Sequence, residues 1–191
     1  LGACDADVPS TNIESNSRVQ ASPLVTPTEP INSAAPVAPI APVVATEPGW
    51  VDDQRIINLP ISEPGSWPTY GQTYKEQRFS QLTQITPENI DELGLAWSRQ
   101  IGDYNMRMQG TPLVVDGVMY VTNGWSVVYA LDATTGEEIW HYDPEVDRSY
   151  IRLACCGPAH NRGAAVYKGK VYVGTFDGRL VAIDATTGEE V

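Results

Sequence analysis

Short runs of alternating apolar and polar residues, separated by turn residues, dominate the second half of the chain. Asp116-Gly117 separates the first two runs, and this dipeptide favours a two-residue β-hairpin. The turn Thr134-Thr-Gly136 separates the last two. The pattern predicts four short antiparallel strands, at 111–115, 118–122, 127–132 and 138–142.

The same pattern recurs 52 positions later without a gap, so that the segment from Asp132 to Gly136 reappears from Asp184 to Gly188. Ungapped repetition at this period indicates a repeat architecture, and four short strands per repeat indicate a propeller blade. The second copy reaches Val191 inside its fourth strand, so we expect about two blades of a larger ring. The predicted fold class is all-β, a β-propeller.

Residues 49–191 are predicted to form the folded part, with order beginning near Trp50. Within it, the run 85–93 has a threonine suited to a helix N-cap, proline at the next position and acidic residues after it. These features predict a short helical turn. The run 95–101 is predicted to be a strand.

The segment 5–48 has proline every few residues and no aromatic side chain, which predicts a disordered tether. The first four residues, Leu1 to Cys4, resemble a bacterial lipobox, in which the cysteine carries the lipid. The alternative is a chance tetrapeptide. No apolar run approaches the roughly 20 residues of a spanning helix. We therefore expect a periplasmic protein anchored to a bacterial membrane by lipid on Cys4 alone.

Acidic residues outnumber basic ones by 24 to 12, which gives a formal net charge of −12 and a pI of about 4.4. This balance argues against binding to nucleic acid or to an anionic membrane surface. It leaves a basic protein partner open. Acidity that only keeps an exported protein soluble explains the same numbers.

Cys155 and Cys156 are adjacent. Neighbouring Cα atoms lie about 3.8 Å apart, closer than the roughly 4.4 to 6.8 Å usual for disulfides, so a bridge between them would be strained. Such strain persists mainly at functional sites, and an oxidising compartment permits the bridge. Two free buried thiols are one alternative. Zinc ligation by Cys156 and His160 is a weaker one, because no second ligand pair follows.

Strand parity predicts where these residues lie. Successive strands of a blade run antiparallel, so the connections that follow the second and fourth strands share one face of the ring. The connection 143–163 contains Cys155, Cys156 and Arg162, and Gln109 precedes the first strand of the other copy. All four are expected on one face near the central axis. Arg162 is suited to carboxylates or quinone oxygens. Alternatively, Arg162 forms a salt bridge between blades and Gln109 merely leads into a strand.

Across roughly residues 65–191 the chain resembles the alcohol dehydrogenases that depend on pyrroloquinoline quinone (PQQ). The resemblance lies in the repeated turn ending at Trp140, the run from Gln109 to Val121, and the adjacent cysteines followed by Asn161-Arg162-Gly163. It implies an eight-bladed propeller whose tryptophans dock one blade on the next. Trp140 matches such a position, and Trp97 is its expected counterpart on the N-terminal strand that helps close the ring.

The resemblance also implies roles for the site residues. Cys155 and Cys156 would form the family's vicinal disulfide against the quinone, and Arg162 would lie near the quinone oxygens. Gln109 stands where the family commonly has an acidic residue. The interval from Cys156 to Arg162 is one residue longer than in methanol dehydrogenases. Ligands for Ca²⁺ or a lanthanide, and the catalytic base, are expected beyond Val191, so no catalytic or metal residue is assigned here.

The implied reaction is oxidation of an alcohol to an aldehyde or ketone, with hydride transfer to PQQ and electrons passing to a cytochrome c or quinone acceptor. One alternative is a non-enzymatic lipoprotein propeller that acts as a scaffold for outer-membrane protein assembly. It shares the lipobox and the tryptophan repeats but has no need of Cys155, Cys156 or Arg162. A sugar dehydrogenase on a similar ring also lacks a reason for the paired cysteines.

Overall fold

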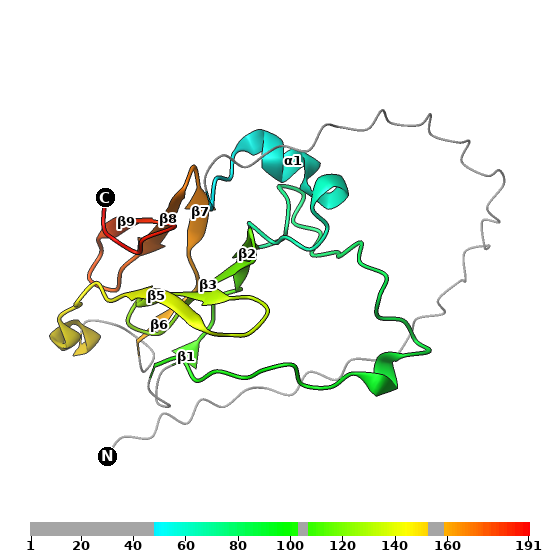
Figure 1. Ribbon diagram of the computed structural model, residues 1–191. Coiled ribbons are helices and arrows are strands. Elements are labelled where there is room, and N and C mark those ends of the chain that lie inside the picture. The colour runs from blue at the N-terminus through cyan, green and yellow to red at the C-terminus, as the bar shows by residue number, and fades with distance from the viewer. Residues whose placement is uncertain (1–47, 103–106, 153–158) are drawn as a thin grey trace, which may run out of the picture. The chain divides into compact units, whose positions relative to one another are not determined.

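The computed structural model describes residues 48–102, 107–152 and 159–191, whose strands form three small sheets (Figure 1). The elements are α1 (Asp53–Ser62), η1 (Ile90–Glu92), β1 (Arg107–Met108), β2 (Leu113–Val115), β3 (Val118–Thr122), β4 (Val128–Asp132), β5 (Glu138–Tyr142), η2 (Arg148–Arg152), β6 (His160–Asn161), β7 (Ala165–Tyr167), β8 (Lys170–Gly174) and β9 (Leu180–Asp184). The predictions made for residues 1–47, including the tether and Cys4, lie outside the described residues.

The first blade is the antiparallel sheet β2-β3-β4-β5, which agrees with the four predicted strands to within two residues at each end. Its first hairpin turns at Asp116 and Gly117, both in the left-handed region with φ of 53° and 77°. That pair of angles is what a two-residue turn of type I′ requires. The second blade repeats the turn at Lys168 and Gly169, with φ of 48° and 72°.

The repeated turn sequence gives the same geometry in both copies. In the first, the Asp132 carboxylate accepts hydrogen bonds from the backbone N–H groups of Thr134 and Thr135, both at 2.8 Å. The equivalent bonds to Asp184 measure 2.9 and 2.8 Å. These backbone donors hold the pKa of each carboxyl below its ordinary value. The turn therefore depends on ionised aspartate at its first position.

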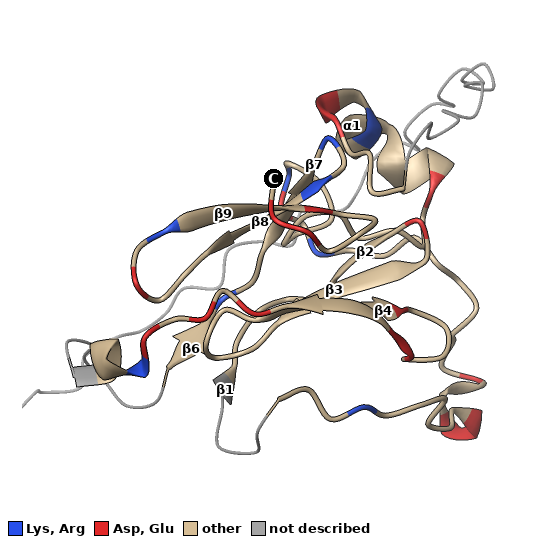
Figure 2. Ribbon diagram, turned by 60° about the vertical axis from the view of Figure 1, so that its left-hand side comes forward, with Lys and Arg blue, Asp and Glu red and all other residues tan. Residues whose placement is uncertain are grey.

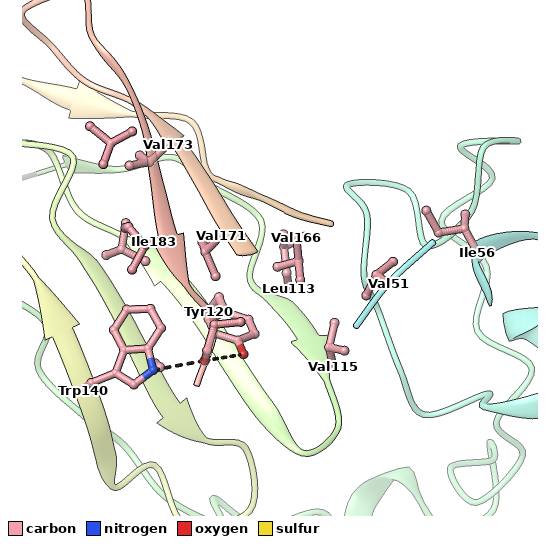
Figure 3. Packing of buried hydrophobic residues seen from close by; sticks show 14 residues of the cluster. Val51, Ile56, Leu113, Val115, Tyr120, Trp140, Val166, Val171, Val173 and Ile183 are labelled. Carbon is pink, nitrogen blue, oxygen red and sulfur yellow. Dashed lines mark hydrogen bonds between the residues drawn. The ribbon is translucent and has the colours of Figure 1, made fainter. Parts of the chain in front are cut away.

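The second blade is the antiparallel sheet β7-β8-β9. Its predicted fourth strand contributes a single bridge, between Ile183 and Glu190. Side chains from the two blades share one core, which also takes in Val51 and Ile56 of the preceding segment (Figure 3). The partial all-β propeller predicted from the repeat is confirmed.

Trp140 docks the first blade onto the second. Its indole N–H donates to the backbone carbonyl of Ala185 at 3.2 Å, and the Tyr120 hydroxyl donates to the same oxygen at 3.1 Å (Figure 3). A Cβ atom at Gly188 would lie only 2.8 Å from the Trp140 ring. Burial of Tyr120 raises its pKa to about 12, so the hydroxyl remains a donor at neutral pH.

Trp97 makes the equivalent contact with the first blade. Its indole donates to the carbonyl of Ala133 at 3.2 Å, and its ring would lie 2.4 Å from a Cβ atom at Gly136. Trp97 and Trp140 therefore dock in the same way, each donating to an alanine carbonyl and packing over a glycine, as the predicted correspondence requires.

Two upstream predictions need correction. The run 95–101 was expected to be a strand, but it forms no ladder with any described strand, and Leu95 is 83% exposed. A strand exists only where a partner edge pairs with it. The helical turn at 85–93 is present but shorter, since a 3₁₀ turn begins at Ile90 with Asn89 as its cap.

Helix α1 was not predicted. Asp52 caps it by accepting from the Arg55 N–H at 2.8 Å. The buried Arg55 guanidinium binds Asp116 at 2.5 Å and Glu63 at 2.7 Å, which ties the helix to the first hairpin. Burial alone would lower the pKa of Arg55, but the two carboxylates raise it above its ordinary value. None of the helices in the described residues is long and apolar enough to cross a membrane.

Candidate functional site

A two-stranded parallel pairing brings the two predicted site segments together. β1 pairs with β6 in a register that matches Arg107 with His160 and Met108 with Asn161. Gln109 and Arg162 are the next residues along each strand, so they lie beside one another at the same end of this pairing. That both residues face the central axis of a ring stays a prediction.

Two glycines make this approach possible. A Cβ atom at Gly110 would lie 2.9 Å from the Cα atom of Gly163, closer than real Cβ contacts allow. Gly163 has a φ of 120°, which L side chains rarely adopt. The same Cβ would lie 3.1 Å from the hydroxyl of Thr122, a buried group that has no hydrogen-bond partner in the part of the chain that the structure describes. The backbones that carry Gln109 and Arg162 therefore touch without intervening side chains.

Asn161 fixes the segment from the side of β6. Its side chain is 9% exposed and its amide nitrogen donates to the Ser126 hydroxyl at 3.1 Å and to the Gly174 carbonyl at 2.9 Å. Its amide oxygen accepts from the Gly163 N–H at 2.8 Å. Buried polar groups satisfied in this way specify a single local conformation.

Arg162 lies at a hollow of about 340 Å³. The hollow is lined by residues of the β3–β4 loop, of β6 and its end, and of the loop after β8, namely Ser126, His160, Asn161, Arg162, Gly174, Thr175 and Phe176. The Arg162 side chain is exposed, and within the described ranges it forms no hydrogen bond or ion pair. It is a guanidinium available to an external acceptor. Gln109 is likewise exposed, with no partner among the described residues.

Two charged residues that follow Phe176 in the sequence, Asp177 and Arg179, form an ion pair with each other. Asp177 accepts hydrogen bonds from Arg179 and from the Thr175 hydroxyl, and these bonds lower the pKa of its carboxyl to about 2. Arg179 also donates to the Pro144 carbonyl at 2.6 Å. The Asp177 carboxylate therefore pairs with Arg179 and not with Arg162.

One aromatic side chain, that of Phe176, lines the hollow. Phe176 meets Trp125 edge to face with ring centroids 5.5 Å apart, and the Arg148 guanidinium lies 5.5 Å from the Trp125 ring. Acidic residues are spread over α1, the strand connections and the C-terminal end (Figure 2). The site thus combines an unpaired arginine with one aromatic side chain on a molecule of negative net charge.

The structure does not describe every predicted site residue. Cys155 and Cys156 fall within 153–158, outside the described residues, so their proposed bridge stays a prediction. His160 lines the hollow, while Cys156, its proposed partner in a zinc site, is not described. Among the described residues no group of three His, Cys, Asp or Glu side chains is placed to hold a metal ion.

Sequence reasoning missed two parts of the site. Asn161 stood inside a recognised motif but received no role, although asparagine before a glycine turn is a common backbone-bonding residue. Ser126 and Phe176 lie in loops that follow the second strand of each blade. Strand parity places the loops after the second strands on the same face as Arg162, and this signal would have identified both residues.

The two docked blades define a part of a β-propeller. A family model described as "PQQ: Glucose/ethanol/alcohol dehydrogenase, beta-propeller domain" matches residues 67–191. The chain belongs to this family.

The relatives that it resembles are alcohol dehydrogenases. Quinohemoprotein alcohol dehydrogenase ADH-IIG of Pseudomonas putida is 54% identical over 149 residues, which are 78% of this chain and 20% of that protein. The dehydrogenase subunit of an alcohol dehydrogenase (quinone) from Komagataeibacter europaeus is 54% identical over 67% of this chain and 17% of its own length. For the 1-butanol dehydrogenase (cytochrome c) of Thauera butanivorans the values are 54%, 66% and 18%.

Solved structures give the same picture. The structure of ADHIIG from Pseudomonas putida HK5 aligns with a TM-score of 0.72 and 55% identity, over 76% of this chain and 21% of that one. A europium-containing methanol dehydrogenase aligns with a TM-score of 0.58 and 35% identity, over 72% and 24%. The chain spans about a fifth of the length of the curated relatives it matches.

Proposed function

We propose that the complete protein oxidises an alcohol to an aldehyde or ketone by hydride transfer to PQQ. The observation that carries this proposal is the β1–β6 register, which places Gln109 beside an unpaired Arg162 at the hollow of a PQQ-family propeller. The names of two relatives, a quinohemoprotein alcohol dehydrogenase and the dehydrogenase subunit of an alcohol dehydrogenase (quinone), support this assignment.

The described residues fit the cofactor chemically. PQQ is flat and carries carboxylates and quinone carbonyls, all of which accept hydrogen bonds. Arg162 offers a fork of N–H donors without a competing acid among the described residues, and Gln109 offers an uncharged amide. When bound, the quinone accepts the hydride from the alcohol. Arg162 would hold the cofactor and stabilise the charge that develops on its oxygens.

The remaining parts of the site are proposed from sequence. Cys155 and Cys156 would form a bridged, flat surface against the quinone. Ca²⁺ or a lanthanide would be held by residues after Val191, and a europium-containing methanol dehydrogenase among the similar structures supports that choice. A cytochrome c or a quinone would take the electrons, as the names of two relatives indicate for those proteins.

The location is proposed from the start of the chain alone. Lipid on Cys4 would anchor the protein to a bacterial membrane on the periplasmic side, and residues 5–48 would act as its tether. A Cys4→Ser variant should then leave the membrane fraction. Retention of that variant in washed membranes would contradict the lipid anchor.

The enzymatic proposal is tested on the full-length protein with an alcohol, PQQ and either Ca²⁺ or a lanthanide. We expect alcohol-dependent reduction of an artificial electron acceptor, and Arg162→Ala should abolish most of it. Arg78→Ala is the matched control, because it removes one exposed arginine that stacks on Tyr70 at 4.0 Å. No dye reduction with either metal would favour the scaffold over the dehydrogenase.

The cysteine pair needs its own measurement. Mass spectrometry of the unreduced protein after alkylation should show Cys155 and Cys156 unlabelled and two mass units lighter than the reduced pair. Full labelling of both thiols would leave the two as free cysteines and remove the proposed surface.

A further inference from the structure

Asn161 is the one member of the Asn161-Arg162-Gly163 motif that the proposed function leaves without a role. It is buried, and each of its two side-chain polar atoms has a partner. Such a residue specifies geometry, because a conformation that breaks one bond leaves a buried polar group unpaired.

The bonds of Asn161 join both blades. Its amide donates to Ser126, which lies in the β3–β4 loop of the first blade, and to Gly174, which ends β8 of the second. Ser126 itself has a φ of 66°, in the left-handed region that L residues rarely adopt, and its side chain is 1% exposed. Strained residues held by buried hydrogen bonds occur mainly at sites where geometry matters.

The third hydrogen bond of Asn161 spans Arg162 along the backbone. The amide oxygen of Asn161 accepts from the N–H of Gly163, so the backbone on both sides of Arg162 is held by one side chain. Arg162 has no bond of its own among the described residues to fix its guanidinium. Its position at the hollow is therefore set by its backbone, and the backbone is set by Asn161.

We propose that Asn161 is a positioning residue that holds Arg162 in the geometry required to bind the quinone cofactor. The inference rests on the proposed function, since Arg162 is the group that would contact PQQ. A purely structural Asn161 would instead join the two blades without any effect on the cofactor. The two roles differ in one respect: positioning acts through Arg162, and its effect should disappear when Arg162 is absent.

The test is a double-mutant cycle on the full-length protein loaded with Ca²⁺ and titrated with PQQ, with the dissociation constant read from quenching of tryptophan fluorescence. Asn161→Ala should weaken PQQ binding about tenfold, the loss expected if Arg162 no longer makes one of its charged hydrogen bonds to the cofactor. In the Arg162→Ala background the same substitution should change binding less than about twofold. Equal effects in both backgrounds, or no effect in the first, would overturn the proposal.

Two further variants make the result decisive. Trp140→Phe removes a different bond between the blades, to Ala185, and should lower the melting temperature without changing PQQ affinity. If Asn161→Ala fails to fold, Ser126→Ala removes a single acceptor from Asn161 and enters the same cycle, with a smaller expected loss. Wild-type protein that binds no PQQ would instead contradict the proposed function, an outcome distinct from a cycle without coupling.

Discussion

The docking of Trp140 on Gly188 allows a controlled test of what holds neighbouring blades together. Gly188 and Gly117 share a φ of 77°, so a Gly→Ala change imposes the same backbone conformation at both. They differ in surroundings. A Cβ atom at Gly188 would lie 2.8 Å from the Trp140 ring, whereas a Cβ atom at Gly117 would meet nothing within 4 Å.

The expected magnitudes follow from this difference. A left-handed conformation costs an L residue about 1–2 kcal/mol, and both substitutions incur that cost. Only Gly188→Ala also forces an extra methyl group against a packed ring, which costs about 1–3 kcal/mol more. The smaller entropy of the unfolded chain favours alanine equally at the two positions. We therefore expect Gly188→Ala to be more destabilising by about 1–3 kcal/mol than Gly117→Ala.

Urea unfolding of the full-length variants, followed by tryptophan fluorescence, measures this difference. In a Trp140→Leu background, Gly188→Ala should no longer carry this additional cost, because the smaller side chain leaves room for the methyl group. Equal midpoints for Gly117→Ala and Gly188→Ala would show that the ring does not require glycine beneath it. The docking account would then be wrong.

Three other outcomes are expected. Asp116→Asn should destabilise the protein by about 2 kcal/mol, less than the roughly 3–5 kcal/mol for breaking a fully buried pair, because the carboxylate is 25% exposed. Burial opposes ionisation of Asp116, but Arg55 and the Gly49 N–H lower its pKa overall. The stability from this ion pair is therefore present above pH 4 and is lost as the pH falls through the lowered pKa. The melting temperature, measured from pH 7 to 2, should depend less on pH in Asp116→Asn than in the wild type. Gln109→Ala should weaken PQQ binding about fivefold, the effect of losing a neutral hydrogen bond, and Arg162→Ala about 30-fold, the effect of losing a charged one. A fluorescence titration in which Gln109→Ala has the larger effect would refute the assignment. A chelator should abolish dye reduction, which Ca²⁺ or a lanthanide should restore. Activity that persists after exhaustive chelation would exclude the metal.

The strands of both blades were predictable because their signals are local. Asp116-Gly117 has the residues that a type I′ turn needs, and the copy at Lys168-Gly169 adopts the same angles. The repeat then predicted the number of strands, and strand parity predicted that Gln109 and Arg162 lie on one face. None of these steps required knowledge of distant contacts.

The failures arose where structure depends on partners. The two-residue strands β1 and β6 have no periodic pattern, and their pairing follows from the close contact of Gly110 with Gly163. Helix α1 contains Pro60, which hides its helical pattern, and it is held in place by buried Ile56 and Leu59 together with the ion pairs of Arg55. The run 95–101 has the composition of a strand but no described edge to pair with.

The two docking turns have the same seven residues, from Asp132 and from Asp184. An indole approaching either turn meets an alanine carbonyl and a glycine, so the residues of the turn do not distinguish one from the other. The sequence of neighbours around the ring must then be decided by the length of chain between each tryptophan and its turn. When two chains meet before either is complete, exchange of equivalent partners is the error to which such a protein is most exposed.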